Sequence, residues 1–194
     1  MTTIDALTKT ALATAVDYTF IKEVIGDRYK VGFMDYESFG PKTTLPKLFK
    51  NKDCLAILFH IKEPNTGRIT AIGHWTLLIK PSKTNKRFYQ FFDSLGLGLR
   101  KILLLTHEAP HLWNLLKKVK WTDSRKALQT QGNKFRECGA WVGLRGFMGN
   151  LTNQQFIGLF KGKKADKMVI HLTLLHYMSH EKIGDNKQND RKTK

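Results

Sequence analysis

The spacing of apolar residues predicts a helix near the start of the chain and strands further on. Between residues 5 and 24, Ala, Leu, Val, Phe and Ile recur every three or four positions, as on the buried face of a helix. Glycines and prolines punctuate residues 31–46, so this stretch is expected to be a loop. Branched and aromatic residues then dominate three short runs, which we expect to be antiparallel strands joined by turns: residues 55–61, 69–79 and 87–93.

The second half of the chain returns mainly to helical spacing. Thr152 is expected to cap one helix, because its hydroxyl can accept a hydrogen bond from a backbone N–H of the first turn. The expected helices cover residues 107–120, 138–148, 152–160 and 166–180, and a short strand is expected over residues 126–130. Strands followed by helices predict an α+β fold.

Length and composition indicate one folded domain, which we place at residues 1–180. The 194 residues are 41% hydrophobic, which is enough for a core and argues against global disorder. From residue 181 onward no apolar face remains, so residues 181–194 are expected to form a mobile basic tail. No apolar run is long enough to cross a bilayer, and the first residues lack the layout of a secretory signal. Only two cysteines, Cys54 and Cys138, are present, which favours a reducing compartment over a disulfide framework.

The charge of the chain is strongly unbalanced. Lys and Arg number 33 against 16 acidic residues, a formal net charge of +17. The basic residues cluster at residues 80–87, 117–120 and 161–167, and clusters produce a local field that scattered lysines do not. An excess of this size can be a solubility device, but the clustering favours non-specific binding of a polyanion, and of nucleic acid above all.

Cys138 is the strongest candidate nucleophile, because it begins the helix expected over residues 138–148. Unpaired backbone N–H groups and the helix dipole favour a thiolate at such a position. Gly139 follows and allows a substrate backbone to approach closely. A lone cysteine is more often inert and buried. The polar stretch of residues 131–137 precedes this one, so we expect the thiol to be reachable.

His74 and Asp93 are the candidate partners of the thiol. Taken alone, His74 would be an ordinary strand residue and Asp93 a turn residue. An antiparallel hairpin, however, brings the start of one strand beside the end of the next, so the imidazole and the carboxylate are expected to be neighbours. Together with Cys138 they would supply the nucleophile, the base and the orienting carboxylate of a thiol hydrolase.

A glutamine is the candidate donor to the oxyanion, together with the backbone N–H of Cys138. Gln129 and Gln131 can face the same side of an extended segment, so spacing does not choose between them. No metal site is expected, since the helical pair His176 and His180 has no acidic or cysteine partner.

Four short motifs follow one another in the chain: His74-Trp75, Asp93-Ser94, Gln131-Gly132 and Cys138-Gly139. This set resembles the adenovirus-type maturation cysteine proteases (adenain) and, more distantly, the proteases that process SUMO and other ubiquitin-like proteins. In that clan His comes first, then an acidic residue or Asn, then Gln, then Cys, whereas papain has Cys before His. Adenain itself has Glu where Asp93 stands here. The resemblance covers roughly residues 31–160 and selects Gln131 over Gln129 as the oxyanion donor.

The resemblance implies a papain-related α+β fold, in which an antiparallel or mixed sheet packs between helices and the nucleophile begins a helix. It implies a monomeric endopeptidase that cleaves viral capsid or core precursors during virion maturation, in the virion, the cytoplasm or a viral factory. Trp75 and Gly139 would contact the substrate, although Trp75 could equally pack in the core. Virophages and Maverick-type transposons carry similar compact, basic proteases. The chemistry needs no cofactor, but DNA activates adenain, and the +17 charge makes DNA a candidate partner here.

Two alternatives remain open at the level of the sequence. The same chemistry could act on host ubiquitin or SUMO conjugates, for which a strong positive charge is not required. The chain could instead be a basic DNA-binding core protein of a virion, with an inert Cys138. A low-pKa thiol reacts with alkylating probes at mildly acidic pH and a buried structural thiol does not, so reactivity separates the enzyme from the core protein.

Overall fold

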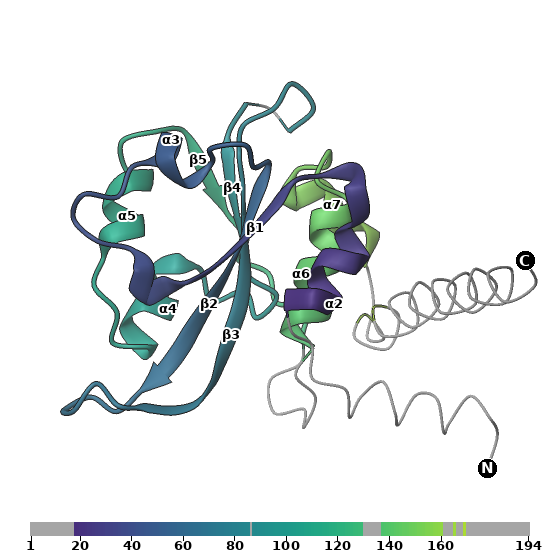
Figure 1. Cartoon of the computed structure of the whole chain (residues 1–194). Helices are drawn as coiled ribbons and strands as arrows, with labels where there is room; N and C mark the ends of the chain where they lie inside the picture. Colours follow the sequence, from purple (N-terminus) through teal and green to yellow (C-terminus); the bar gives the residue numbers. More distant parts are fainter. Residues whose placement is uncertain (1–17, 86, 130–136, 161–164, 166–168, 170–194) are drawn as a thin grey trace, which may run out of the picture.

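A five-stranded mixed sheet forms the centre of the protein (Figure 1). The computed structural model describes residues 18–85, 87–129, 137–160, 165 and 169. The strands lie in the order β1-β2-β3-β4-β5. Strand β3 is antiparallel to both of its neighbours, β2 and β4, whereas β1 is parallel to β2 and β5 is parallel to β4. They span Val31–Asp35 (β1), Cys54–Lys62 (β2), Ile69–Ile79 (β3), Tyr89–Phe92 (β4) and Trp121–Asp123 (β5).

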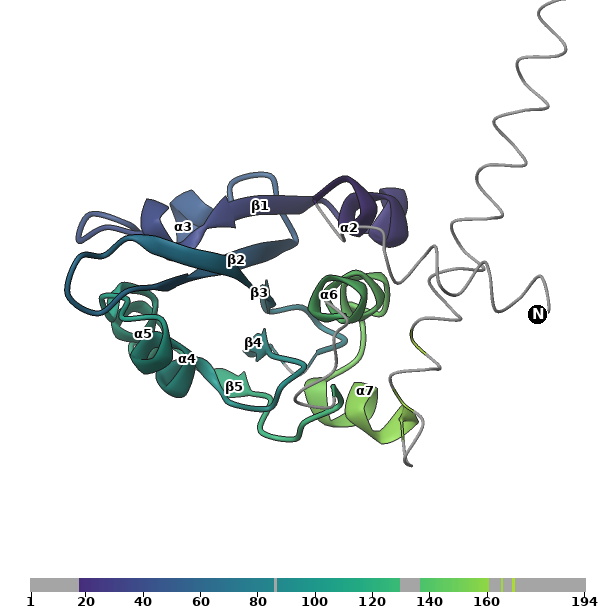
Figure 2. The ribbon, with the colours of Figure 1, turned by 90° about the horizontal axis from the view of Figure 1, so that it is seen from below.

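Helices cover both faces of this sheet (Figures 1 and 2). On one face lie α2 (Tyr18–Ile25), α6 (Cys138–Phe147) and α7 (Asn153–Leu159). On the other lie α3 (Leu45–Leu48), α4 (Leu99–Leu105) and α5 (His111–Leu116). Two short 3₁₀ turns, η1 (Gly26–Arg28) and η2 (Tyr36–Ser38), flank β1. The architecture is therefore α+β, as the order of apolar patterns predicts.

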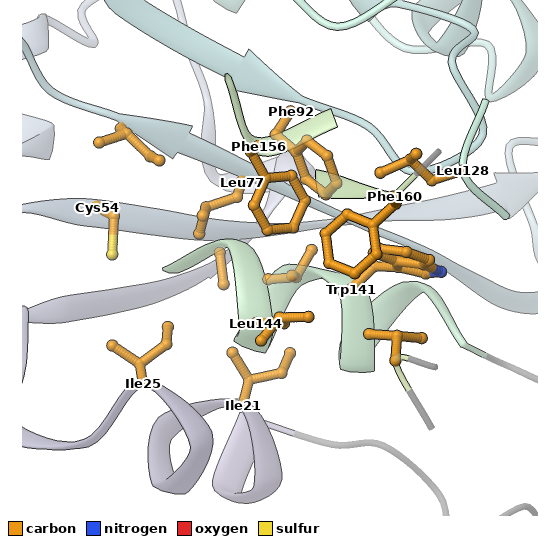
Figure 3. Close-up of a cluster of buried hydrophobic side chains, with 14 of the residues drawn as sticks. Ile21, Ile25, Cys54, Leu77, Phe92, Leu128, Trp141, Leu144, Phe156 and Phe160 are labelled. Carbon is orange, nitrogen blue, oxygen red and sulfur yellow. The ribbon is translucent and has the colours of Figure 1, made fainter. Parts of the chain in front are cut away.

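The core on the α6 side is built around Trp141 (Figure 3). Its indole ring packs edge-on against Phe160 of the chain after α7, with ring centroids 4.9 Å apart, and against Phe156 of α7 at 6.3 Å. Leu77 of β3 and Phe92 of β4 join the same cluster from the sheet. Each fully buried side chain of this size contributes about 1.5–3 kcal/mol. This cluster therefore holds α6 on the sheet, and with it the residue that begins α6.

Glycines let α6 lie close to α2. A Cβ at Gly146 would come within 2.5 Å of the Cδ1 atom of Ile25, and one at Gly143 within 3.0 Å of Val24 Cγ1. Side chains at these two positions would push the helices apart. The small residues of α6 are therefore explained by its packing against α2.

Arg145 ties α6 to its neighbours from inside the core. Its side chain is fully buried, and its guanidinium donates hydrogen bonds to the Gln90 side chain of β4 and the Asn153 side chain at the start of α7. It also donates to the carbonyl oxygens of Met148 and Leu151 at 3.0 and 2.9 Å. A buried charge is tolerated when its donors are satisfied, so Arg145 fixes the position of α6 relative to β4 and to the start of α7.

Several predicted elements are confirmed. The strands expected at residues 55–61, 69–79 and 87–93 correspond to β2, β3 and β4, and the helix expected at 138–148 corresponds to α6. Thr152 caps α7 as expected: its hydroxyl accepts from the Gln155 backbone N–H at 3.2 Å, and the Gln155 side chain accepts from the Thr152 N–H in return.

Other expectations were wrong. The stretch expected to be a loop contains β1, a short strand that is stable only because it pairs with β2, so its local pattern does not predict it. The helix α4 was missed between residues 99 and 105, and the helix expected at 107–120 is limited to α5. The strand expected at residues 126–130 lies earlier in the chain, at β5.

Some predictions fall outside the described residues. These are the first part of the helix expected at 5–24, most of the helix expected at 166–180 with His176 and His180, and the tail 181–194. Among the residues that the structure describes, no helix combines the length and the apolar character needed to cross a membrane.

Candidate active site

His74, Asp93 and Cys138 come together where β3 and β4 diverge at the N-terminus of α6. The last residue pairs of β3 with β4 are Leu77 with Phe92, Leu78 with Phe91 and Ile79 with Gln90, so Asp93 follows directly after the paired segment. His74 Nε2 lies 2.6 Å from Asp93 Oδ1, and the ring is also hydrogen-bonded to the Cys138 thiol. The expected neighbourhood of the three residues is thus confirmed.

The Asp93 carboxylate is held by backbone donors of its own loop. It is fully buried and accepts hydrogen bonds from the N–H groups of Leu95 at 2.9 Å, Leu97 at 2.6 Å and Gly98 at 3.1 Å. Burial alone would raise its pKa, but the bond and charge of His74 and the backbone donors outweigh burial, so the pKa of Asp93 is lowered. Asp93 therefore remains a carboxylate and faces His74 in one fixed orientation.

Two glycines make this loop possible. Gly96 and Gly98 adopt φ of +65° and +77°, a region that side chains rarely occupy. A Cβ at Gly96 would come within 2.4 Å of the Ala127 backbone nitrogen, and one at Gly98 within 2.6 Å of Asp123 Oδ2. The pair of glycines three and five residues after Asp93 is a signal for this loop that can be recognised in the sequence.

Ser124, the residue that follows β5, holds the backbone of Asp93 in place. Its hydroxyl accepts from the Asp93 N–H at 2.7 Å and donates to the Asp93 carbonyl oxygen at 3.0 Å, and the side chain is buried. The two bonds fix the backbone on both sides of the Asp93 Cα. Nothing in the sequence pointed to Ser124, because its role depends on β5 lying parallel to β4.

Asp123, just before Ser124, adds a second carboxylate to the same region. Its Oδ2 accepts from the Leu99 N–H at 3.2 Å, whereas its buried Oδ1 has no hydrogen-bond partner among the described residues. Burial, with the nearby charge of Asp93, raises the pKa of Asp123 to about 6 despite the Leu99 bond. Asp123 thus bears on the electrostatics of Asp93 without touching His74.

Gly73 sets the position of His74. A Cβ at Gly73 would lie only 1.5 Å from the Phe59 carbonyl oxygen on β2, so no other residue fits without moving β3. The register of β2 with β3 shifts just beyond Phe59, which pairs with His74. The close approach of the two strands at Gly73 is therefore part of what directs His74 toward Asp93.

Cys138 is more buried than expected, with 8% of its surface exposed. Burial alone would raise the pKa of the thiol. The hydrogen bond and charge of His74, and the backbone N–H groups of Trp75 and Gly139, outweigh it, so the pKa of Cys138 is lowered. The thiolate is therefore stabilised by direct partners in addition to its place at the start of α6.

His74 and Cys138 each favour the charged form of the other. Burial alone would lower the pKa of His74, but the hydrogen bond to Asp93, followed by the bond to Cys138 and the charges of both partners, raises it to about 9. At neutral pH His74 is thus an imidazolium beside the Asp93 carboxylate, and its charge favours the ionised form of the Cys138 thiol. Because Nε2 faces Asp93, Nδ1 is the ring nitrogen available to Cys138.

Comparison with protein-family models, with curated proteins and with solved structures found no match.

Trp75 and Gly139 both touch the thiol through their backbone. The ring of Trp75 is half-buried, packs against the core on the α6 side and meets Phe33 of β1 edge-on at 6.3 Å. Gly139 is buried in the first turn of α6. Both residues therefore stand beside the sulfur atom, and their contact with a substrate remains a prediction.

Gln131 lies outside the described residues, whereas Gln129 can be placed. The Gln129 N–H donates to the Ser94 carbonyl oxygen at 3.0 Å, and the Ser94 hydroxyl donates to Gln129 Oε1 at 2.8 Å. Ser94 follows Asp93 directly, so the chain that leads toward Cys138 is anchored beside the carboxylate. The role of Gln131 as oxyanion donor stays a prediction.

Proposed function

We propose that this chain is a cysteine endopeptidase of the adenain type. The observation that carries the proposal is the continuous hydrogen-bonded set of Asp93, His74 and Cys138, with a raised pKa at the imidazole and a lowered pKa at the thiol. Peptide hydrolysis by a thiol needs these three groups in this order. The α+β fold with a mixed sheet between helices is compatible with that class.

The first half of the proposed reaction forms a thioester. The Cys138 thiolate attacks the scissile carbonyl carbon, and the carbonyl oxygen becomes an oxyanion. The backbone N–H of Cys138, at the helix start, and the Gln131 amide are the proposed donors to it. As the carbon–nitrogen bond breaks, the His74 imidazolium gives its Nδ1 proton to the departing amine, which leaves the acyl group on sulfur.

The second half releases the acid. The now neutral His74 takes a proton from a water molecule, the resulting hydroxide attacks the thioester carbonyl, and the thiolate departs beside the imidazolium. Asp93 stays ionised throughout, because its backbone donors stabilise the carboxylate. Its task is to hold Nε2–H, and thereby the ring, in the orientation that presents Nδ1 to sulfur.

The proposed substrates are capsid or core precursors, cleaved during virion maturation in the virion or a viral factory. This part rests on the resemblance of the four motifs, and the excess of positive charge supports nucleic acid as a partner. Ubiquitin or SUMO conjugates are the competing substrates, and fluorogenic derivatives of each distinguish them: fast turnover of either would overturn the precursor assignment.

Substitution of the thiol tests the chemistry. We expect Cys138→Ala to abolish cleavage of co-expressed capsid precursors, with product masses read by mass spectrometry, and to leave thermal unfolding nearly unchanged. Cys54→Ala is the matched control, since it removes a thiol of the same burial from β2. Undiminished cleavage by Cys138→Ala would reject the assignment.

A further inference from the structure

A basic cavity lies at the edge of the sheet, away from the thiol. It has a volume of about 540 Å³ between β1, η2 and α3. Three lysines line it, Lys42, Lys47 and Lys52, and apolar side chains that include Met34 and Leu48 contribute to its walls. Lys42 and Lys47 are exposed and Lys52 is half-buried, so the cavity presents three ammonium groups over a partly apolar surface.

One rim of the cavity is a turn closed by two hydrogen bonds. The Gly40 N–H donates to the Thr43 hydroxyl at 2.9 Å, and the Thr43 N–H donates to the Gly40 carbonyl oxygen at 3.0 Å. Lys42 lies within this turn, between Gly40 and Thr43. The backbone of Lys42 is therefore held in place, while its exposed side chain can adjust to a ligand.

Lys52 reaches the cavity by crossing β1. Its methylene stem lies over Gly32, where a Cβ would come within 2.4 Å of the Lys52 Cδ. The absence of a side chain at Gly32 provides the space for this path. The packed stem loses less freedom when the ammonium group meets an anion, as expected for a pre-positioned lysine.

The acidic residues near the cavity already have other partners, and two of these partners are lysines. Glu37 lies 2.9 Å from Lys62, Asp53 lies 2.7 Å from Lys80, and Asp35 lies 3.3 Å from His60. Within the described part of the chain, no ion pair neutralises Lys42, Lys47 or Lys52. The positive charge of the cavity is therefore left for a ligand.

We propose that Lys42, Lys47 and Lys52 form a binding site for the phosphodiester backbone of nucleic acid. Lysine ammonium groups are compact charges that contact phosphates without reading bases. The lining holds no Arg, Asn, Gln or aromatic residue, so neither bidentate base contacts nor base stacking are expected from it. The net charge of +17 favours a polymer over a small anion, because every phosphate contact releases counterions and contacts accumulate along a polyanion.

The site lies across the sheet from the proposed catalytic thiol. Leu48 of α3 belongs to the core of the face that α4 and α5 cover, whereas α6 covers the opposite face (Figure 1). Nucleic acid held at the cavity would leave the start of α6 accessible, so one chain could be retained on nucleic acid while it cleaves protein. This inference rests on the nucleic-acid partner proposed above and not on the thiol chemistry.

The test compares two triple variants of the full chain that lose the same charge. One is Lys42→Gln/Lys47→Gln/Lys52→Gln; the other is Lys22→Gln/Lys101→Gln/Lys118→Gln, which removes three exposed lysines scattered over α2, α4 and the chain after α5. Binding to short labelled duplexes of two unrelated sequences is followed by fluorescence anisotropy across a salt series. For the variant that lacks Lys42, Lys47 and Lys52 we expect the plot of log K against log salt to become less steep by about 2–3, equally for both sequences. For the control variant we expect the steepness to decrease by less than about 1.

The outcomes distinguish failure of the proposed lysine site from failure of nucleic-acid binding as such. Equal loss in the two variants would overturn the site and leave non-specific binding by total charge. No binding by the wild type would remove the nucleic-acid partner itself, while alkylation of Cys138 on the same preparation reports on the thiol independently. Full competition by pyrophosphate at equal phosphate concentration would overturn the polymer as the ligand. If the triple variant unfolds, Lys42→Gln/Lys47→Gln, which changes only the two exposed lysines, must give the same specific loss for the site to stand.

Discussion

Cys54 and Cys138 have nearly the same burial, but the pKa of one thiol is raised and the pKa of the other is lowered. Cys54, at the start of β2, is 2% exposed, and burial followed by the charge of Asp53 raises its pKa to about 12. Cys138, at the start of α6, is 8% exposed, yet its pKa is lowered by His74 and by backbone donors. Burial therefore does not make a thiol inert; the sign of the neighbouring charge and the direction of the hydrogen bonds do.

Removing the imidazole should have the largest effect, because it should remove the difference in reactivity between Cys138 and Cys54. In His74→Gln, Cys138 keeps its burial but loses the cation, so alkylation by iodoacetamide at pH 6 should slow about 100-fold. Mass spectrometry of the modified peptides reads both cysteines in one experiment. Cys54 serves as the internal control, because it should stay unreactive in both proteins. Unchanged labelling of Cys138 would show that His74 does not set its acidity.

The pH dependence of cleavage should follow the charge on His74. Its pKa of about 9 lies above the ordinary value of 6.5, so the imidazolium persists through neutral pH and is lost as the pH rises through about 9. Because the leaving amine needs that proton, kcat/KM should fall about tenfold per pH unit above this point. Peptide hydrolysis measured between pH 6 and pH 10 tests this. A decline centred near 6.5 would contradict the raised pKa.

Gly73→Ala should move Cys138 toward the behaviour of Cys54 without touching any titrating group. The new Cβ would collide with the Phe59 carbonyl oxygen, so β3 must shift and carry His74 with it. We expect a loss of about 1–3 kcal/mol of unfolding free energy, as for overpacking, together with slower alkylation of Cys138. Urea denaturation and the labelling assay measure the two effects. Gly158→Ala, on α7, is the control, since no atom lies near its Cβ and its φ is outside the left-handed region.

Asp123→Asn should have the smallest effect, a change in how stability depends on pH near the Asp93 end of the site. The folded-state pKa of Asp123, about 6, lies above the ordinary carboxyl value of 3.8, so the wild type loses stability as the pH rises through about 6 and its side chain ionises. The amide carries no charge, so the variant should be more stable than the wild type by about 1 kcal/mol at pH 8 and nearly equal to it at pH 4. Thermal unfolding at the two pH values measures this. A variant less stable at pH 8 would mean that the Asp123 charge is compensated.

The strongest local patterns were sufficient for much of the fold. Continuous apolar runs identified β2 and β3, and the apolar stretch after Cys138 identified α6, because long patterns override local exceptions. Thr152 and Gln155 identified the start of α7, since a capping box is a local device. By contrast, β1 and β5 are short strands whose stability comes from pairing with β2 and β4, and α4 begins after a loop folded around Asp93. Such elements depend on contacts that neighbouring residues in the sequence do not encode.

For the candidate site, the order of residues along the chain was enough to predict the chemical groups: a thiol at a helix start, an imidazole in one strand and a carboxylate at the end of the next. The adjacency of His74 and Asp93 was also predictable, because hairpin geometry forces it. How these groups are held and charged became visible only in the folded chain: Ser124, just after β5, bonds the Asp93 backbone, Gly73 lets β3 approach β2, and Trp75 donates its N–H to the thiol. The physical reason is that acidity and orientation depend on burial and on partners distant in the chain, which exist only once the strands and helices have packed together.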